Sequence, residues 1–382
     1  MAAVLLTATP TLAQAEDYTV GLLLPYSGVY AALGEEIDSG FTLALEQRAG
    51  EIPEAEITIV REDTEVKPPI ALSKTRKLVL QDEVDVLVGV VSSGVLGAMR
   101  DFVHQSGTPL IVANAGNDDA TGKRGSPYIT RLSFSNSQVS RPMGPWMAEQ
   151  GIESVFTLAP DYAAGHQMIN AFTEAFEDAG GKVVGQDFTP FQNTKDFGPY
   201  LTTARASGAD AIFAFYAGGE AISFVKQYES FGLAEDVPLH GTGFLTSSLY
   251  VESQGSAAEG VITSLHYAPA IATAENQAFV EAFSAAHGRL PSEYAVQGYD
   301  AGQALVEAIK SGATDRASLA TALSEVQFTS PRGPVAIDPA TNNIVQNIYI
   351  YKTVAGDAGM TQKILGVVEA VRDPAQSAQA VQ

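Results

Sequence analysis

The chain has 382 residues, of which 46% are hydrophobic and 17% charged, so it is long enough for two domains and apolar enough to fold around large cores. Its 44 acidic and 22 basic residues give a formal net charge of −22, which disfavours nucleic acid and anionic lipid as partners. The absence of cysteine excludes disulfides, thiolate metal sites, cysteine nucleophiles and a lipid anchor on an N-terminal cysteine. No apolar run after the N-terminus approaches the ~20 residues of a membrane span, so we expect no direct membrane insertion.

Residues 1–15 are predicted to be a signal peptide. An apolar stretch is followed by Pro10 and by Ala13-Gln14-Ala15, the small-x-small pattern that signal peptidase accepts. The segment lacks the basic residue with which a complete signal begins, so either the true start lies upstream or the segment is an N-terminal tail. We expect a mature chain that begins near Glu16 and is exported to the periplasm as a soluble protein without a lipid anchor.

The chain then alternates short β-rich runs with amphipathic runs of helical length. In its first half we expect strands at 19–24, 57–61, 84–91 and 109–112, with helices at 34–50, 69–81 and 95–107. Ile37, Phe41 and Ala44 share one helical face. The run 84–91 is nearly all apolar, as is typical of a strand covered on both faces.

The same order recurs in the second half of the chain. We expect strands at 155–159, 182–188 and 211–215, with helices at 165–180, 197–207 and 220–231. Three pairs of landmarks are each separated by 125 residues: Asp85 and Asp210, Gly94 and Gly219, and Gly107 and Gly232. This repetition predicts two α/β lobes, each with a parallel sheet covered by helices on both faces. Because ligands of such sheets bind at the carboxyl ends of the strands, two facing lobes predict a cleft.

Motifs of common catalytic and cofactor sites are missing from the sequence. None of the five histidines has a metal-ligand spacing, and neither a P-loop nor a strand-linked dinucleotide loop occurs. The turn at 89–94 has the wrong spacing for a hydrolase nucleophile. We therefore expect no enzyme activity, no catalytic residue, no metal and no cofactor, and keep an enzyme acting in the acidic cleft as an alternative.

Candidate binding residues follow the predicted strands. Ser92 and Ser93 lie between a buried strand and a helix start, where free N–H groups, the helix dipole and two hydroxyls favour an anion; simple N-capping is the alternative. Small residues at 113–116 and 241–243 permit close approach of the backbone to a ligand, and aromatic residues supply flat walls. The candidates are Tyr26, Ser92, Ser93, Asn114, Ala115, Gly116, Tyr162, Tyr216, Gly243 and Phe244, followed by Tyr30, Arg141 and His266.

Five motifs, in this order, resemble the periplasmic substrate-binding proteins of ABC transporters, of the leucine/isoleucine/valine-binding type. They are VGLLLPYSG at 20–28, VDVLVG at 84–89 with the serines that follow, PLIV at 109–112, DYAAG at 161–165 and QGYDA at 297–301. The resemblance covers residues 18–371. It implies a type I periplasmic binding fold, in which two Rossmann-like, doubly wound lobes are joined by three crossovers with a ligand cleft between them.

The resemblance also implies a division of the chain and a mode of action. The crossovers are expected near Leu132, Ser264 and Ser330. The N-terminal lobe is then 16–132 plus 265–330, the C-terminal lobe 133–264 plus 331–371, and 372–382 a flexible tail. Such proteins close on a small molecule by a hinge motion and deliver it to a permease in the inner membrane, and we expect this one to be a monomer.

Departures from the family pattern bear on the ligand. Amino-acid binders of the family hold the ammonium group with acidic residues, but here residues 241–245 contain no acid and Asn136 stands at the other position. Asn136 and Phe134, two residues before it, are further candidate binding residues. An unpaired buried ammonium costs several kcal/mol. We therefore expect an organic carboxylate, with an aromatic acid such as a benzoate or hydroxycinnamate as the best candidate, its carboxylate at Ser92 and Ser93 and its ring against Phe244. The alternatives are a branched-chain amino acid, another amino acid or an amide, and a ligand-sensing receptor domain.

Overall fold

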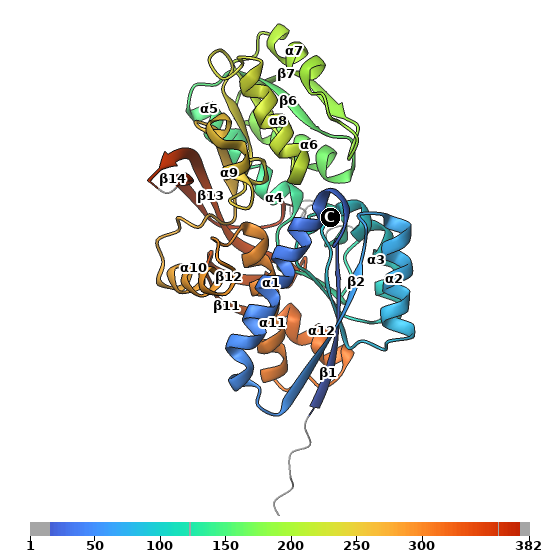
Figure 1. The fold of residues 1–382 in the computed structure, drawn as a ribbon. Coiled ribbons are helices and arrows are strands. Elements are labelled where there is room, and N and C mark those ends of the chain that lie inside the picture. Colours follow the sequence, from blue (N-terminus) through green and yellow to red (C-terminus); the bar gives the residue numbers. More distant parts are fainter. Residues whose placement is uncertain (1–15, 122–123, 358, 375–382) are drawn as a thin grey trace, which may run out of the picture.

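The computed structural model describes residues 16–121, 124–357 and 359–374. The predicted signal peptide, 1–15, and the last part of the predicted tail, 375–382, lie outside the described residues. No helix in the described ranges is long and apolar enough to cross a membrane. Figure 1 shows two bodies stacked end to end, with α1, α2 and α3 in one and α6, α7 and α8 in the other.

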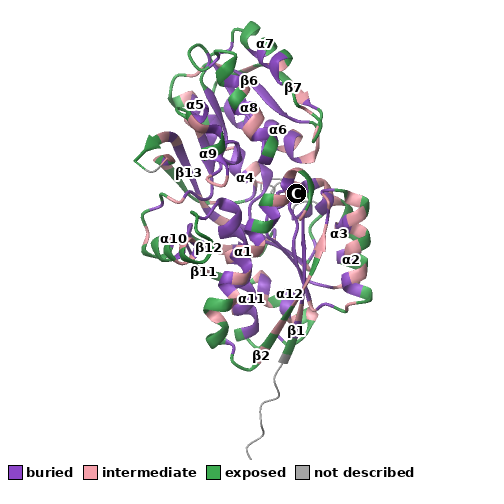
Figure 2. Cartoon of the chain, viewed as in Figure 1, coloured by how far each residue is buried: buried purple, intermediate pink, exposed green. Residues whose placement is uncertain are grey.

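The first half forms a parallel sheet whose strand order is β2-β1-β3-β4-β5. Its strands are β1 (Glu16–Leu24), β2 (Ala55–Asp63), β3 (Val86–Gly89), β4 (Leu110–Val112) and β5 (Ile129–Arg131), and its main helices α1 (Ala31–Arg48), α2 (Pro68–Leu80) and α3 (Ser93–Ser106). Neighbouring residues on β1 point into different cores: Leu22 packs with α1 and Leu23 with α2 and α3. Both faces of the sheet are therefore buried (Figure 2), which explains the unbroken apolar run. The four strands and three helices expected here are confirmed.

The second half repeats this design with the order β10-β9-β8-β6-β7. Its strands are β6 (Ser154–Pro160), β7 (Lys182–Thr189), β8 (Ala211–Ala214), β9 (Leu239–Thr242) and β10 (Ile262–Leu265), and its helices α4 (Asn136–Ser140), α5 (Met143–Glu149), α6 (Ala163–Asp178), α7 (Gly198–Ala206), α8 (Gly218–Ser230) and α9 (Val251–Gln254). The expected strands and helices are again present, so the duplicated α/β order is confirmed.

The C-terminal quarter returns to the first half and then joins the two sheets. It contains α10 (Ala274–His287), α11 (Glu293–Lys310), α12 (Arg316–Ser324), β11 (Gln327–Ser330), β12 (Gly333–Asp338), β13 (Asn343–Gly356) and β14 (Gly359–Val371). Helix α11 packs closely on α1, because a Cβ on Gly298 would lie 1.9 Å from the carbonyl oxygen of Ile37. Strand β13 pairs with β5 at Asn343 and with β10 at Tyr349, so it passes from one sheet to the other between these two residues. The lobe boundaries given above stay a prediction.

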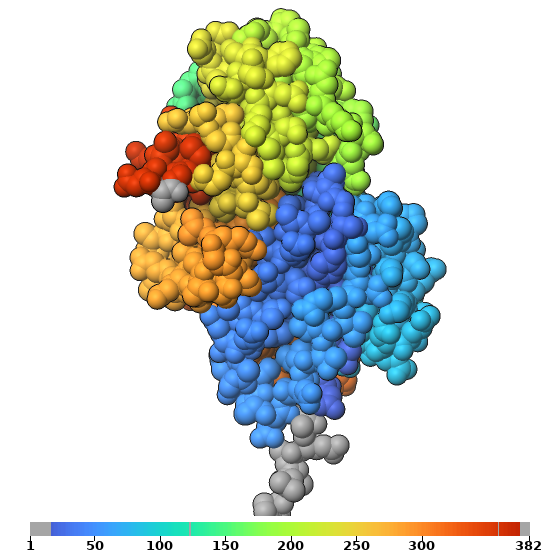
Figure 3. Space-filling view, in the orientation of Figure 1, coloured from blue at the N-terminus to red at the C-terminus, as the bar shows by residue number. Residues whose placement is uncertain are grey.

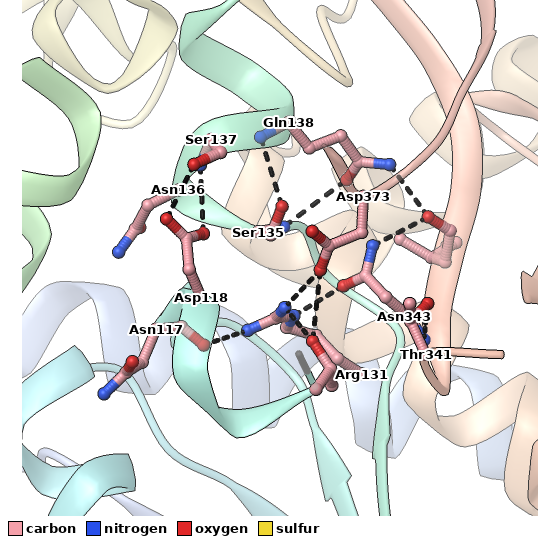
Figure 4. Close-up of polar contacts among 12 residues, drawn as sticks. Asn117, Asp118, Arg131, Ser135, Asn136, Ser137, Gln138, Thr341, Asn343 and Asp373 are labelled. Atoms are coloured by element: carbon pink, nitrogen blue, oxygen red, sulfur yellow. Dashed lines mark hydrogen bonds and ion pairs between the residues drawn. The ribbon is translucent and has the colours of Figure 1, made fainter. Parts of the chain in front are cut away.

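Two buried arginines hold the junction between the halves. Arg131 of β5 forms an ion pair with Asp373 at 3.1 Å and donates to Asn343 Oδ1 at 2.5 Å (Figure 4). Arg332 pairs with Asp300 at 2.7 Å and donates to the carbonyl oxygen of Ser133 at 3.1 Å. Because Asp373 is buried, the expectation of a loose tail is wrong at this residue. Its carboxylate stays there because it neutralises Arg131 in the core.

Candidate functional site

A cavity lies where the carboxyl ends of the strands of both sheets meet. It contains about 310 Å³ of space between atoms, part of it open to solvent. It is lined by Tyr30, Leu33, Val91, Ser93, Asn114, Gly116, Phe134, Asn136, Tyr162, Ala164, Met168, Phe215, Ala217, Phe244 and Tyr294. The halves touch beside it: a Cβ on Gly218 would lie 2.7 Å from the carbonyl oxygen of Val29. In Figure 3 the blue N-terminal part of the first half meets the yellow-green second half.

One polar side of the cavity is formed by helix starts. Ser93 begins α3, while Ala164 and Ala217 lie at the starts of α6 and α8. The first N–H groups of a helix have no partner within it, and the helix dipole makes them electropositive. Asn136 Nδ2 donates to Ser93 Oγ at 3.2 Å, so the Ser93 hydroxyl keeps its hydrogen for another acceptor. This side of the cavity is therefore suited to an anionic group.

The other walls are aromatic. Phe244 packs against Phe134, Phe215 and Tyr294, with ring centroids 5.0, 6.1 and 5.9 Å apart. Tyr162 stacks on Phe191 at 4.0 Å, and its hydroxyl lies 3.3 Å from that of Tyr30. Rings in these stacked and tilted arrangements provide an apolar wall with few polar atoms.

Behind the cavity runs a chain of three polar side chains. Asn114 Nδ2 donates to Gln297 Oε1 at 2.7 Å, and Gln297 Nε2 lies 3.0 Å from His266 Nε2. His266 is fully buried and stacks on Phe134 at 5.7 Å. Burial, together with the positive charge of Arg332, holds the pKa of His266 well below its usual value, so the ring is neutral.

The structure brings many of the predicted residues together. Those that line the cavity are Tyr30, Ser93, Asn114, Gly116, Phe134, Asn136, Tyr162 and Phe244; their contact with a ligand stays a prediction. Ser92, Ala115, Gly243 and His266 lie close by without lining it. Ser92 stands at the N-cap position of α3 without a side-chain capping bond, and Ala115 faces the core under α3. Gly243 lies against Tyr351, whose hydroxyl would be 2.0 Å from an added Cβ.

The structure places three predicted residues away from the cavity. The Tyr26 hydroxyl donates to Asp38 Oδ2 at 2.9 Å beside a separate surface depression. Tyr216 is buried in the second half, where its hydroxyl accepts a bond from Thr189 at 3.2 Å. Arg141 is ion-paired with Glu174. We therefore do not retain these three as binding residues.

Several lining residues were not predicted from the sequence. They are Leu33, Val91, Ala164, Met168, Phe215, Ala217 and Tyr294. Successive side chains of an extended segment point in opposite directions, so Phe215 faces the cavity and Tyr216 the core. This alternation could have indicated from the sequence that only one of the two neighbouring residues, Phe215 and Tyr216, faces the cavity. Tyr294 reaches the cavity from α11, and no local signal marks it.

Two α/β halves, joined by a shared strand and with a cavity at their strand ends, define the class of two-lobed binding proteins with the type I periplasmic binding fold. Residues 17–358 match the family described as periplasmic binding protein, and the chain belongs to this family. The resemblance and the fold expected from the sequence are thereby confirmed, and the chain is a periplasmic solute-binding protein of the ABC-transporter type.

Relatives and solved structures cover nearly the whole chain. The Leu/Ile/Val-binding protein homolog 6 of Brucella melitensis biotype 1 is 31% identical over 376 residues, covering 96% of this chain and 95% of that protein. A solute-binding protein of an ABC transporter from R. palustris, in complex with benzoate, is 38% identical with a TM-score of 0.88, covering 94% of this chain and 98% of that chain. A second, from Rhodopseudomonas palustris BisB5 in complex with 3,4-dihydroxy benzoic acid, is 34% identical with a TM-score of 0.90, covering 94% and 99%.

Proposed function

We propose that this protein captures an aromatic carboxylate, such as a benzoate or hydroxycinnamate, and delivers it to the permease of an ABC import system. The observation that carries the proposal is the composition of the cavity wall: none of the described residues that line it is charged. The ammonium group of an amino acid would be buried there without a carboxylate partner, which is costly. A carboxylate would instead meet the Ser93 hydroxyl and the N–H groups of helix starts.

The aromatic part of the ligand follows from the remaining walls. Phe134, Phe215 and Tyr294 pack on Phe244 and form with it an aromatic wall, against which an aromatic ring can pack. The two R. palustris proteins, bound to benzoate and to 3,4-dihydroxy benzoic acid, support the same ligand class. The Brucella relative, by its name, favours a branched-chain amino acid as the alternative.

Capture in this proposal is binding without chemical conversion. The two lobes close on the ligand, and the closed monomer docks on the permease from the periplasm. Contacts that join the halves beside the cavity support a closed state: Gln167 of α6 accepts a bond from the backbone N–H of Asp118 at 3.1 Å. Asp118 also accepts a bond from the Ser137 hydroxyl at 2.7 Å (Figure 4).

Calorimetry on protein stripped of ligand by unfolding and refolding tests the proposal. The panel contains benzoate, hydroxybenzoates, hydroxycinnamates, aliphatic acids, leucine, valine and amides. Binding of aromatic acids and not of leucine or valine is the expected result. Tight binding of leucine or valine alone would replace the proposal with the amino-acid alternative. Loss of ligand uptake in cells lacking the protein would indicate transport rather than sensing. Recovery of unaltered ligand from the protein would indicate binding rather than catalysis.

A further inference from the structure

The hydrogen bonds that link Asn114, Gln297 and His266 behind the cavity run in one donor-to-acceptor direction, and this direction affects which ligand can bind. Asn114 lines the cavity, whereas Gln297 and His266 are fully buried behind it. With the Gln297 amide in this orientation, its nitrogen donates to the neutral His266, which accepts through Nε2 and carries its proton on Nδ1, a buried atom with no partner among the described residues. The other end of the Gln297 amide is then an oxygen, and it accepts from Asn114 Nδ2.

This direction determines which atom Asn114 has free. One of the two Nδ2 hydrogens is engaged with Gln297, and the carbonyl oxygen Oδ1 receives no hydrogen bond from any residue in the described ranges. Asn114 is only 5% exposed, so Oδ1 has little access to solvent once the cavity is filled. A buried amide oxygen is stabilised when a donor pairs with it.

We infer that Asn114 Oδ1 is the acceptor for a hydroxyl group on the aromatic ring of the ligand, and that His266 acts through Gln297 as the positioning residue that keeps this oxygen available. The inference rests on the proposed function. A carboxylate or an unsubstituted ring has no hydrogen to offer Oδ1, whereas a phenolic O–H does. The protein then selects hydroxylated aromatic acids over the parent acid.

The opposite direction of the chain would reverse this preference. If His266 Nε2 carried the proton, the amides of Gln297 and Asn114 would both rotate, so that Gln297 Nε2 donates to Asn114 Oδ1 and the Asn114 N–H groups face an acceptor on the ligand. The tautomer of His266 thus decides whether the Asn114 oxygen is available to the ligand or engaged with Gln297. The tautomer of His266 affects the ligand only through the amides of Gln297 and Asn114. Replacing the imidazole should therefore change ligand selectivity more than the stability of the fold.

The first test compares the affinity of the wild-type protein for benzoate with that for the three monohydroxybenzoate isomers, by calorimetry. We expect at least one isomer to bind about tenfold or more tightly than benzoate, because a missing partner for a buried polar group is penalised strongly. Equal or weaker binding of all three isomers relative to benzoate would overturn the inference and leave the proposed function standing. Failure of every aromatic acid to bind would overturn both.

Variants then test the residues. In Asn114→Leu the ratio of hydroxybenzoate affinity to benzoate affinity should fall to near one. In His266→Phe the ratio should fall toward the same value, while the new ring can still stack on Phe134. His240→Phe is the matched control, since His240 is also buried but packs against Trp146 away from the cavity, and its ratio should match the wild type. If Asn114→Leu does not fold, Asn114→Ser removes the reach of the amide. A wild-type ratio in the folded His266→Phe protein would overturn the positioning role.

Discussion

Asn136 Nδ2 donates a 3.2 Å hydrogen bond to Ser93 Oγ, and this bond joins α4 of the second half to α3 of the first. The same nitrogen donates to Gln167 Oε1 at 2.7 Å. Asn136 stands where amino-acid binders of the family are expected to carry an acid. Here it connects the two sides of the cavity and offers no charge for an ammonium group.

Removal of the Ser93 hydroxyl should weaken ligand binding. In Ser93→Ala a carboxylate loses one charge-assisted hydrogen bond, worth about 1.5–3 kcal/mol, so the Kd of an aromatic acid should rise about tenfold or more. Calorimetry measures the change. Ser92→Ala is the control, because Ser92 does not line the cavity. A larger loss in Ser92→Ala than in Ser93→Ala would place the anion elsewhere.

Gly116 should not tolerate a side chain. A Cβ there would lie 2.3 Å from Asn136 Oδ1 and 2.5 Å from Phe134 Cε2, so Gly116→Ala must displace two residues that line the cavity. We expect at least a tenfold loss of affinity and incomplete closure, seen as a smaller ligand-induced decrease in the radius of gyration by X-ray scattering. Gly219→Ala is the control, since a Cβ added at Gly219 would meet no neighbouring side chain or backbone within 4 Å. Wild-type affinity in Gly116→Ala would show that the contact is not needed.

Stability should fall as pH rises because of Glu293. This residue begins α11, is buried, and accepts a bond from Ser247 Oγ at 2.9 Å. Burial, with a smaller effect of the negative charge of Glu36, raises its pKa from 4.5 to about 8. Below pH 4.5 the carboxyl is protonated in both the folded and the unfolded chain, so its contribution to stability is fully present.

Between pH 4.5 and 8 the unfolded chain loses this proton and the folded chain keeps it, so the contribution is lost progressively. At pH 8 Glu293→Gln should be more stable than the wild type by on the order of 3 kcal/mol, and its denaturation midpoint should vary less between pH 5 and 8. Urea denaturation across this range measures both. Glu325→Gln, at an exposed site, should follow the wild-type curve. Parallel curves for Glu293→Gln and the wild type would contradict the prediction.

Loss of Arg332 should destabilise the junction between the halves. Arg332→Met leaves the buried carboxylate of Asp300 without its partner and should lower the free energy of unfolding by about 3–5 kcal/mol. Arg205→Met breaks an exposed pair with Asp236 and should cost about 1 kcal/mol or less. Similar losses in the two variants, measured by urea denaturation, would mean that burial of the Arg332 pair is unimportant.

The order of strands and helices follows directly from the sequence. The spacing of apolar residues within a segment shows which of its faces is buried. The apolar run at 84–91 therefore predicted a strand covered on both faces, and Ile37 and Phe41 predicted one buried face of a helix. The paired landmarks, such as Gly107 and Gly232, predicted two halves of one design. Ser93, Asn114 and Gly116 were predicted as candidates because they follow strands, where ligands of parallel sheets bind, and all three line the cavity.

Tertiary packing alone decided which aromatic residues face the cavity and how its polar atoms are arranged. Tyr26 and Tyr216 follow strands as Tyr162 does, yet Tyr26 bonds to Asp38 and Tyr216 to Thr189, because side-chain direction depends on the exact turn after each strand. Tyr294 and Gln297 approach from a helix that is distant in the sequence. The sequence by itself determined the fold class and the lack of an acid for an ammonium group, since both depend on residue type and order. The direction of the bonds from His266 to Asn114 depends on contacts between distant segments, so only the folded chain decides it.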